Sequence, residues 1–396
     1  MTSRVFIAGV GMIPFRKPGT SEHYDVMGAQ AVGQALADAG LDYAEVQQAY
    51  AGYVYGDSTC GQKALYHVGM TGIPVMNVNN NCATGSSALF LARQAVQSGA
   101  VDCALAVGFE EMGAGALKSV WTDRPRATER AGKLANELVG RPDLPGAIRQ
   151  FAGAGQAHMQ KYGTRLETFA SIRAKASRHA ANNPLAVFRN VLTTEDVMAA
   201  PMLWDGVMTR LMACPPTCGA AAAIVVSERF ARKHGLRTDV LIAGQSVTTD
   251  TPSSFETRDM IRVVGFDMTR AAAAHAYEQA GVGPADVDVI ELHDCFAQNE
   301  LLSYEGLGLC DEGGAEKLVN DGDNTYGGKW VVNPSGGLLS KGHPLGATGL
   351  AQCYELTQQL RGTAAQRQVD GARVALAHNV GLGGACVVTI YQAASA

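Results

Sequence analysis

Cys82 is the residue whose type and position are best suited to covalent chemistry. It lies in the segment 79–85, between a strand-like stretch over 75–78 and a helix-like stretch over 85–97. A helix N-terminus presents unpaired amide N–H groups and a partial positive charge, which lower a thiol pKa and favour a nucleophilic thiolate. We therefore predict a nucleophile at Cys82, with a small buried structural cysteine as the alternative.

His343 is the candidate proton acceptor for that thiol. An internal repeat, described below, aligns Cys82 with Gly346, so His343 lies three residues before the counterpart of Cys82. Two helix N-termini related by a twofold axis can face each other, which would bring the imidazole within reach as a general base. A hydrogen-bonded structural histidine is the alternative.

A third group of polar residues follows the predicted strand that ends near Leu292. Because sites in α/β sheets form at the carboxyl ends of strands, we interpret His293 as a hydrogen-bond donor and Cys295 as a proton shuttle. Zinc is an alternative, with His293, Asp294, Cys295, His343 and His378 as its ligands, but the spacing matches no zinc pattern, and we predict no metal.

The glycine-rich segment 377–385 joins two strand-like stretches. Such a turn can present backbone N–H groups to an oxyanion. It leads into a strand and not a helix, so it is not a dinucleotide fingerprint. Cys214 and Cys218, four residues apart, are interpreted as structural.

These candidates are positioned by two similar halves of the chain. Four segments of the first half recur in the same order in the second, with offsets that grow from 235 to about 270: 5–9 with 240–244, 35–41 with 276–282, 83–85 with 347–349, and 104–108 with 375–381. In each half, short apolar stretches alternate with longer amphipathic ones. We expect two βαβαβ-type halves, a largely parallel sheet covered on both faces, and a pseudo-twofold axis.

A basic insert separates parts of the first half. Residues 118–189, from Lys118 onward, contain 13 Lys and Arg against five Asp and Glu, although the whole chain carries a net charge of −5. We expect a first half over 1–117 that resumes over 206–236, a loop domain over 118–205, and a second half over 237–396. The insert is interpreted as a lid over a polyanionic substrate, with a solvated face or subunit contact as the alternative.

Composition limits the class of protein. The 396 residues are 47% hydrophobic, which allows a sizeable core, and nine scattered cysteines fit a reducing compartment. Mild acidity argues against nucleic acid as the main partner, and no apolar stretch approaches a membrane span. We predict a cytoplasmic globular enzyme.

Several motifs taken together resemble the thiolase superfamily, and within it the thiolase domain of sterol-carrier-protein-type (non-specific lipid-transfer) thiolases. The motifs are Asn80–Gly85, Asn333–Gly337, Gly342–Gly349, His293–Phe296, His378–Gly384, Gly52–Ser58 and Gly322–Trp330. The resemblance implies a five-layer αβαβα fold, a dimer or dimer of dimers, and a loop domain that covers coenzyme A (CoA). Since the sequence ends at Ala396, we expect neither a lipid-transfer domain nor a peroxisomal Ser-Lys-Leu signal.

The resemblance also implies roles for individual residues. Cys82 would be the acylated nucleophile, and His343 would take its proton and bind the thioester oxygen. His293 would share that oxygen site, where ordinary thiolases carry asparagine. Cys295 would be the acid/base, because His378 stands where ordinary thiolases carry that cysteine. The amides of Cys82 and Gly381 would form a second oxyanion hole.

Two further features of the chain bear on the resemblance. Thr217-Cys218-Gly219 stands where the family commonly has Ser-Asp-Gly, which changes the local hydrogen bonds. The basic lid fits the phosphates of CoA, and its candidate contacts are Arg124, Arg126, Arg130 and Lys133.

The implied reaction is CoA-dependent cleavage of a 3-ketoacyl-CoA, as in fatty-acid β-oxidation, with CoA as co-substrate and no permanent cofactor. Three alternatives stay open: condensation of two acyl-CoAs by the same site, a thiolase-like retro-aldolase of steroid side-chain degradation, and a non-catalytic acyl-CoA or lipid binder.

Overall fold

The computed structural model describes residues 4–113, 116 and 123–394, and its main feature is a ten-stranded sheet. The strand order is β10-β9-β11-β12-β8-β1-β7-β4-β2-β3, and a separate two-stranded ladder joins β5 to β6. A single residue pair, Phe6 with Leu241, connects β1 to β8. The sheet is therefore two five-stranded units that meet at a narrow seam.

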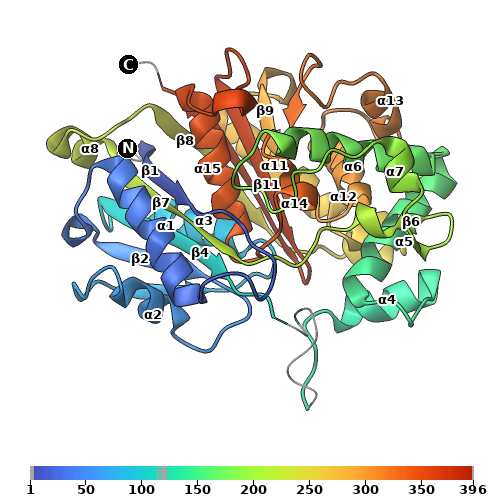
Figure 1. Cartoon of the computed structure of the whole chain (residues 1–396), viewed down its shortest axis with the longest axis horizontal. Coiled ribbons are helices and arrows are strands. Elements are labelled where there is room, and N and C mark those ends of the chain that lie inside the picture. The colour runs from blue at the N-terminus through green and yellow to red at the C-terminus, as the bar shows by residue number, and fades with distance from the viewer. Residues whose placement is uncertain (1–3, 114–115, 117–122, 395–396) are drawn as a thin grey trace.

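Each unit corresponds to one half of the chain (Figure 1). The first half consists of β1 (Val5–Met12), α1 (Tyr24–Ala39), β2 (Gln48–Gly52), α2 (Cys60–Tyr66), β3 (Val75–Val78), α3 (Thr84–Gln97), β4 (Cys103–Glu110), β7 (Gly219–Ser227) and α8 (Glu228–His234). The second consists of β8 (Val240–Thr248), α9 (Ser253–Glu256), α10 (Met260–Val263), α11 (Phe266–Ala280), β9 (Val289–Glu291), α12 (Ala297–Gly306), α13 (Ala315–Asn320), β10 (Val331–Val332), α14 (Gly337–Ser340), α15 (Thr348–Arg361), β11 (Val374–Gly381) and β12 (Ala385–Ala393).

The sequence repeat has a steric cause that both halves share. A Cβ on Gly9 in β1 would lie 2.3 Å from the carbonyl oxygen of Ala35 in α1. A Cβ on Gly244 in β8 would lie 2.2 Å from the carbonyl oxygen of Ala276 in α11. Each glycine thus lets a helix pack directly on its strand, and the predicted duplication is confirmed.

The predicted largely parallel sheet is wrong at one strand of each unit, the neighbour of the seam strand. β2 is parallel to β3 and β4, and β9 is parallel to β10 and β11. β7 is antiparallel to β1 and β4, and β12 is antiparallel to β8 and β11. The turn over 382–384 explains one reversal, because so short a connection can join only antiparallel neighbours.

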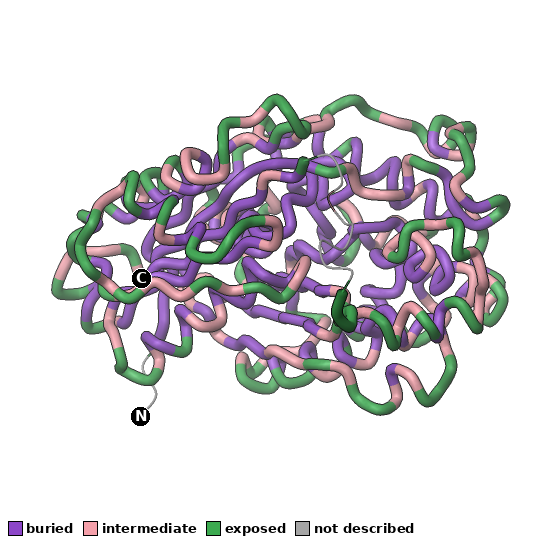
Figure 2. Tube along the Cα trace, turned by 90° about the horizontal axis from the view of Figure 1, so that it is seen from below, coloured by how far each residue is buried: buried purple, intermediate pink, exposed green. Residues whose placement is uncertain are grey.

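Three apolar cores define the layers. One lies between α1 and α2 and the first unit, a second surrounds α3 and α15 between the two units, and a third joins the second unit to α11, α12 and the insert. Figure 2 shows the buried trace running through the middle of the molecule. The arrangement confirms the predicted αβαβα layers, with α3 and α15 at the centre.

The insert lies beside the second half (Figure 1). Its elements are α4 (Glu129–Val139), α5 (Gly146–Tyr162), α6 (Leu166–Ala181), α7 (Thr194–Met198), β5 (Met202–Trp204) and β6 (Met208–Thr209). α5 and α6 pack against α12. The predicted boundary at 117/118 and Lys118 lie outside the described residues, and the division into domains stays a prediction.

Within the described ranges, every helix is too short or too polar to cross a membrane.

Candidate active site

Cys82 lies in a loop that side chains hold firmly at the entrance to α3. The Asn81 backbone is left-handed, with φ of 52°, and its Nδ2 donates to the carbonyl oxygen of Leu382 at 2.7 Å. Thr84 Oγ1 accepts from Asn80 N–H at 2.9 Å and donates to the Asn81 carbonyl oxygen at 2.6 Å. The Cys82 residue is partly exposed, although its thiol is buried deeply enough to raise the thiol pKa.

His343 is fixed in one tautomer by the loop that precedes α15. The backbone N–H of His343 donates to Thr217 Oγ1 at 2.6 Å, and the ring Nδ1 lies 2.7 Å from Thr348 Oγ1. The Thr348 hydroxyl donates to the Pro344 carbonyl oxygen at 3.0 Å, so it must accept from Nδ1–H. Nε2 therefore carries a lone pair, and it is buried with no hydrogen-bond partner. This is the form of imidazole that can accept a proton.

His293 has the opposite tautomer. Asn379 Nδ2 donates to its Nδ1 at 2.9 Å, which places the ring proton on Nε2. Asn379 is itself oriented by Ser86, whose Oγ lies 3.3 Å from Asn379 Oδ1. The His293 and His343 rings are nearly perpendicular, with centroids 5.1 Å apart. Nε2 of His343 is thus a hydrogen-bond acceptor, and Nε2 of His293 is a donor.

The structure brings Cys82, His293 and His343 together. One ligand atom from each side chain lies within 4.8 Å of the other two, although Cys82 comes from the first half and both histidines from the second. A Cys-His-His set can hold a divalent ion such as zinc. It can equally pass a proton from a thiol to an imidazole beside a second donor.

The electrostatics of Cys82 differ from the prediction made from its position. Burial of the thiol, with a smaller contribution from Glu110, raises the pKa of Cys82 to about 12. The predicted lowering by the helix N-terminus was therefore wrong, because desolvation of the thiolate outweighs it. Burial, assisted by Lys341, lowers the pKa of His343 to about 3. The resting pair is a neutral thiol beside a neutral imidazole.

Glu110, at the end of β4, was not identified from the sequence. Its carboxylate accepts from the N–H groups of Val54, Tyr55 and Gly346 at 3.1, 2.9 and 3.0 Å. Burial raises the pKa of Glu110 to about 7. It ties the loop that carries His343 to the first half, and an acidic residue at a strand end was the available signal.

Cys295 is buried beside this set of atoms. Its carbonyl oxygen accepts from Cys214 N–H at 2.9 Å. Burial, then the nearby Cys214 and Cys82 thiols, raise the pKa of Cys295 well above its usual value. Cys214, interpreted from the sequence as structural, thus borders both candidate reactive cysteines.

Gly381 lies against the loop that carries Cys82, since a Cβ there would be 2.1 Å from the Asn80 carbonyl oxygen. A small cavity of about 40 Å³ opens beside the same turn. Its lining includes Gly381, Arg130, Gln150, Asp250 and Phe255. Arg130 stacks on Phe255, with its guanidinium carbon 4.2 Å from the ring centroid.

The other predicted lid cations do not line that cavity. Arg124 pairs with Asp123 at 2.9 Å, Lys133 pairs with Glu129 at 2.5 Å, and Arg126 is exposed. Part of the positive charge of the insert is neutralised inside the protein, since Lys175 is buried in an ion pair with Glu300 of α12. The net charge of the insert therefore overstates its exposed positive surface.

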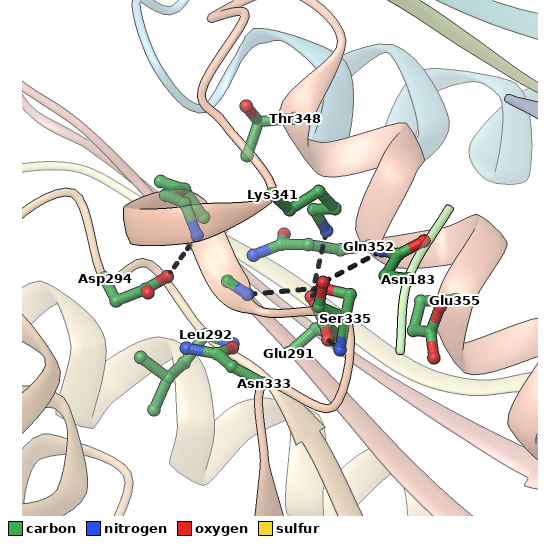
Figure 3. A network of polar contacts seen from close by, with 12 residues as sticks. Asn183, Glu291, Leu292, Asp294, Asn333, Ser335, Lys341, Thr348, Gln352 and Glu355 are labelled. Atoms are coloured by element: carbon green, nitrogen blue, oxygen red, sulfur yellow. Dashed lines mark hydrogen bonds and ion pairs between the residues drawn. The ribbon is translucent and has the colours of Figure 1, made fainter. Parts of the chain in front are cut away.

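A buried polar network holds α14 and Lys341, which precede the loop that carries His343 (Figure 3). Lys341 Nζ lies 3.1 Å from Glu291 Oε2, and Ser335 Oγ donates to the same carboxylate at 2.7 Å. Asp294 accepts from the N–H groups of Leu338 and Leu339 at 2.7 and 3.2 Å. α14 and the loop after it are thus held by carboxylates at the end of β9.

Comparison with known proteins gives matches along nearly the whole chain. Residues 5–188 match the model "Thiolase, N-terminal domain", and residues 247–392 match "Thiolase C-terminal domain-like". The chain is 55% identical to sterol carrier protein 2 of Homo sapiens, over 98% of this chain and 72% of that protein. It is 35% identical to benzoylsuccinyl-CoA thiolase subunit BbsB of Thauera aromatica, over 96% of this chain and 95% of that protein.

Solved structures share the fold at lower identity. An Ltp2-ChsH2(DUF35) aldolase superposes with a TM-score of 0.83 at 22% identity, over 98% of both chains. Human mitochondrial 3-ketoacyl-CoA thiolase in complex with CoA superposes with a TM-score of 0.74 at 19% identity, over 99% of this chain and 98% of that one. At such identities the likeness establishes the fold alone.

Proposed function

The chain belongs to the thiolase family, and from that premise we propose that it catalyses CoA-dependent cleavage of a 3-ketoacyl-CoA through an acyl-Cys82 intermediate. The observation that carries the proposal is the complementary pair of tautomers beside one thiol. His343 Nε2 is an unpartnered acceptor, and His293 carries its ring proton on Nε2.

The first half-reaction begins with proton transfer from Cys82 to His343 Nε2. The thiolate attacks the keto carbon of the substrate, the bond between C2 and C3 breaks, and the electron pair passes to the thioester as an enolate. Protonated His343 and His293 then both donate to the enolate oxygen, which is the charge that develops in the transition state. Cys295 protonates the enolate carbon, and the shortened acyl group stays on Cys82.

The second half-reaction transfers that group to CoA. The Cys295 thiolate takes the proton of the CoA thiol, which attacks the acyl carbonyl while the amides of Cys82 and Gly381 stabilise the oxyanion. Cys82 leaves and recovers its proton from His343, which completes the proton balance. Two half-reactions on one cysteine predict ping-pong kinetics.

The raised pKa of Cys82 is compatible with this order of reaction steps. A neutral thiol does not react with other electrophiles in the resting enzyme, so the thiolate forms only as the proton moves to His343 during attack. We propose that the loop domain over 118–205 covers CoA, with Arg130 at the cavity beside Gly381. We further propose that the protein is a homodimer that works in the cytoplasm.

A panel of 3-ketoacyl-CoAs with and without free CoA tests this function against its alternatives. Cleavage that requires CoA supports a thiolase. Carbon–carbon cleavage that proceeds without CoA indicates a retro-aldolase, and binding without turnover indicates a non-catalytic binder. The panel also identifies the acyl chain, and the reverse assay with two acyl-CoAs measures condensation. A chelator control should leave the rate unchanged if the Cys-His-His set works without a metal.

The role of Cys295 has its own test. Cys295→Ala should still become acylated on Cys82, but its steady-state rate should fall by about 10²–10⁴, the usual weight of general acid/base catalysis. Cys310→Ala, which changes a partly buried cysteine near α13, is the control. Wild-type turnover by Cys295→Ala would assign the acid/base role to another residue.

A further inference from the structure

A second cavity lies at the seam between the two five-stranded units. Its volume is about 330 Å³, and its lining comes from both halves: Arg4, Val5, Arg93, Gln97, Leu241, Ile242, Ala243 and Gln279. β1 and β8 share a single residue pair here, so the strands leave room between them. Arg93 lies nine residues beyond Thr84 on α3, about 14 Å along the helix axis, and so the cavity is distinct from the Cys82 site.

Arg93 is the unusual residue of this cavity. It is 6% exposed, and its Nε is buried with no hydrogen-bond partner. Its Nη1 makes one long contact, 3.4 Å to Gln279 Oε1. Among the described residues no carboxylate pairs with it, and burial lowers the pKa of the guanidinium. A buried charge without a counter-ion is costly, and proteins ordinarily pair it.

The described residues that line the cavity around Arg93 are cationic or neutral. Arg4 contributes a second cation at the rim, where it lies over Phe6 and 3.9 Å from Glu228. Gln97 and Gln279 contribute amides, and none of the described residues that line the cavity is acidic. The volume is at the lower end of the range for small-molecule sites and exceeds what a lone inorganic ion fills.

We propose that this cavity binds a small organic anion, a carboxylate or a phosphate ester, with Arg93 as its principal contact. The guanidinium offers a planar fork that matches either group, and the unpartnered Nε is the donor the ligand would satisfy. Gln279, Gln97 and Arg4 would complete the polar lining. The proposal does not depend on the reaction at Cys82.

Gln279→Glu is the most informative variant. Gln279 is exposed, so the change should not disturb folding, and it places a carboxylate next to Arg93. The built-in counter-ion should raise the midpoint of thermal unfolding and weaken anion binding at least tenfold. Arg93→Lys, which keeps the charge and removes the fork, should also weaken binding. Arg232→Gln, which removes an exposed arginine paired with Glu228, is the matched control and should bind as wild type.

Calorimetric titration with inorganic phosphate and with succinate measures the affinities, and the comparison with Gln279→Glu separates this cavity from the substrate site. Phosphate binding and succinate binding separate the two ligand classes, and either one supports the site if Gln279→Glu weakens it. Absence of binding by both anions to the wild-type protein would overturn the proposal. So would equal affinity in the wild type and Gln279→Glu, since Arg93 would then be satisfied by the carbonyl groups at the end of α3.

Discussion

The loops that enter α3 and α15 are equivalent in the duplicated fold, yet their environments differ sharply. In the first, Cys82 is partly exposed. In the second, Gly346 occupies the equivalent position and is buried. A Cβ on Gly346 would lie 2.3 Å from the Phe109 carbonyl oxygen and 2.7 Å from that of Gly52. One copy of the loop leaves its residue partly exposed, and the other is packed against the first half.

The difference shows how a duplicated scaffold can build one asymmetric site. The second loop gives up a reactive side chain at the helix entrance, and its backbone can therefore approach β4 closely enough for Gly346 N–H to reach Glu110. That approach carries His343 to within 4.8 Å of the Cys82 thiol. Packing in one half thus sets the proton acceptor for the other.

Removing the acceptor should have the largest effect on this asymmetry. His343→Asn keeps a polar side chain but lacks the Nε2 lone pair, so acylation of Cys82 should slow by about 10²–10⁴. Rapid-quench measurement of acyl-enzyme formation gives the rate, with His275→Asn on the exposed side of α11 as the control. Acylation by His343→Asn within threefold of the wild-type rate would remove His343 from the mechanism.

Filling the enclosed position should destabilise the protein. Gly346→Ala places a methyl group against two carbonyl oxygens, and overpacking of this kind typically costs about 1–3 kcal/mol of unfolding free energy. Gly33→Ala is the matched control, because a Cβ there meets open space in the middle of α1, where alanine favours the helix. Urea denaturation compares the two. Equal stability of both variants would show that the close approach at Gly346 is unimportant.

A smaller effect should follow removal of the Glu110 charge. Because the pKa of Cys82 is about 12, its alkylation should accelerate tenfold per pH unit without a plateau below pH 10. Glu110→Gln removes a negative charge and should lower that pKa, so alkylation at pH 8 should be several-fold faster. Since the pKa of Glu110 is about 7, the difference should vanish below pH 6, where the wild-type carboxyl is protonated.

Peptide mass mapping of iodoacetamide-treated protein isolates Cys82 from the other cysteines. Glu111→Gln, one residue along and paired with His23 at the surface, should match the wild type. A ratio of rates that does not change between pH 5.5 and pH 8 would contradict the electrostatic role given to Glu110.

The duplication was predictable from the sequence because close packing of a helix on a strand requires glycine at equivalent positions of both halves. Gly9 and Gly244 recur at equivalent positions since each lets a helix touch its strand. The direction of β7 and β12 was not predictable from alternating elements, because it depends on where the last strand of each half inserts. The aligned repeat alone places His343 opposite Cys82, and the structure brings their side chains together.

Finer properties of the site depend on contacts between distant segments. The tautomer of His343 is set by Thr348 and Pro344 together, and Glu110 acts on a loop 236 residues away. The thiol pKa was predicted in the wrong direction because the dipole is a local property, whereas burial is a property of the whole fold. The proximity of Cys214 to Cys295 was not predictable for the same reason, since the two residues are 81 positions apart along the chain.

The proposed mechanism requires a covalent intermediate at Cys82, and intact-protein mass spectrometry tests this requirement most directly. The wild-type protein, mixed with a cleavable 3-ketoacyl-CoA without free CoA, should gain one acyl group that peptide mapping places on Cys82. Added CoA should discharge it, and Cys82→Ala should gain nothing. Turnover without an adduct, or an acyl group on another residue, would contradict an acyl-Cys82 mechanism.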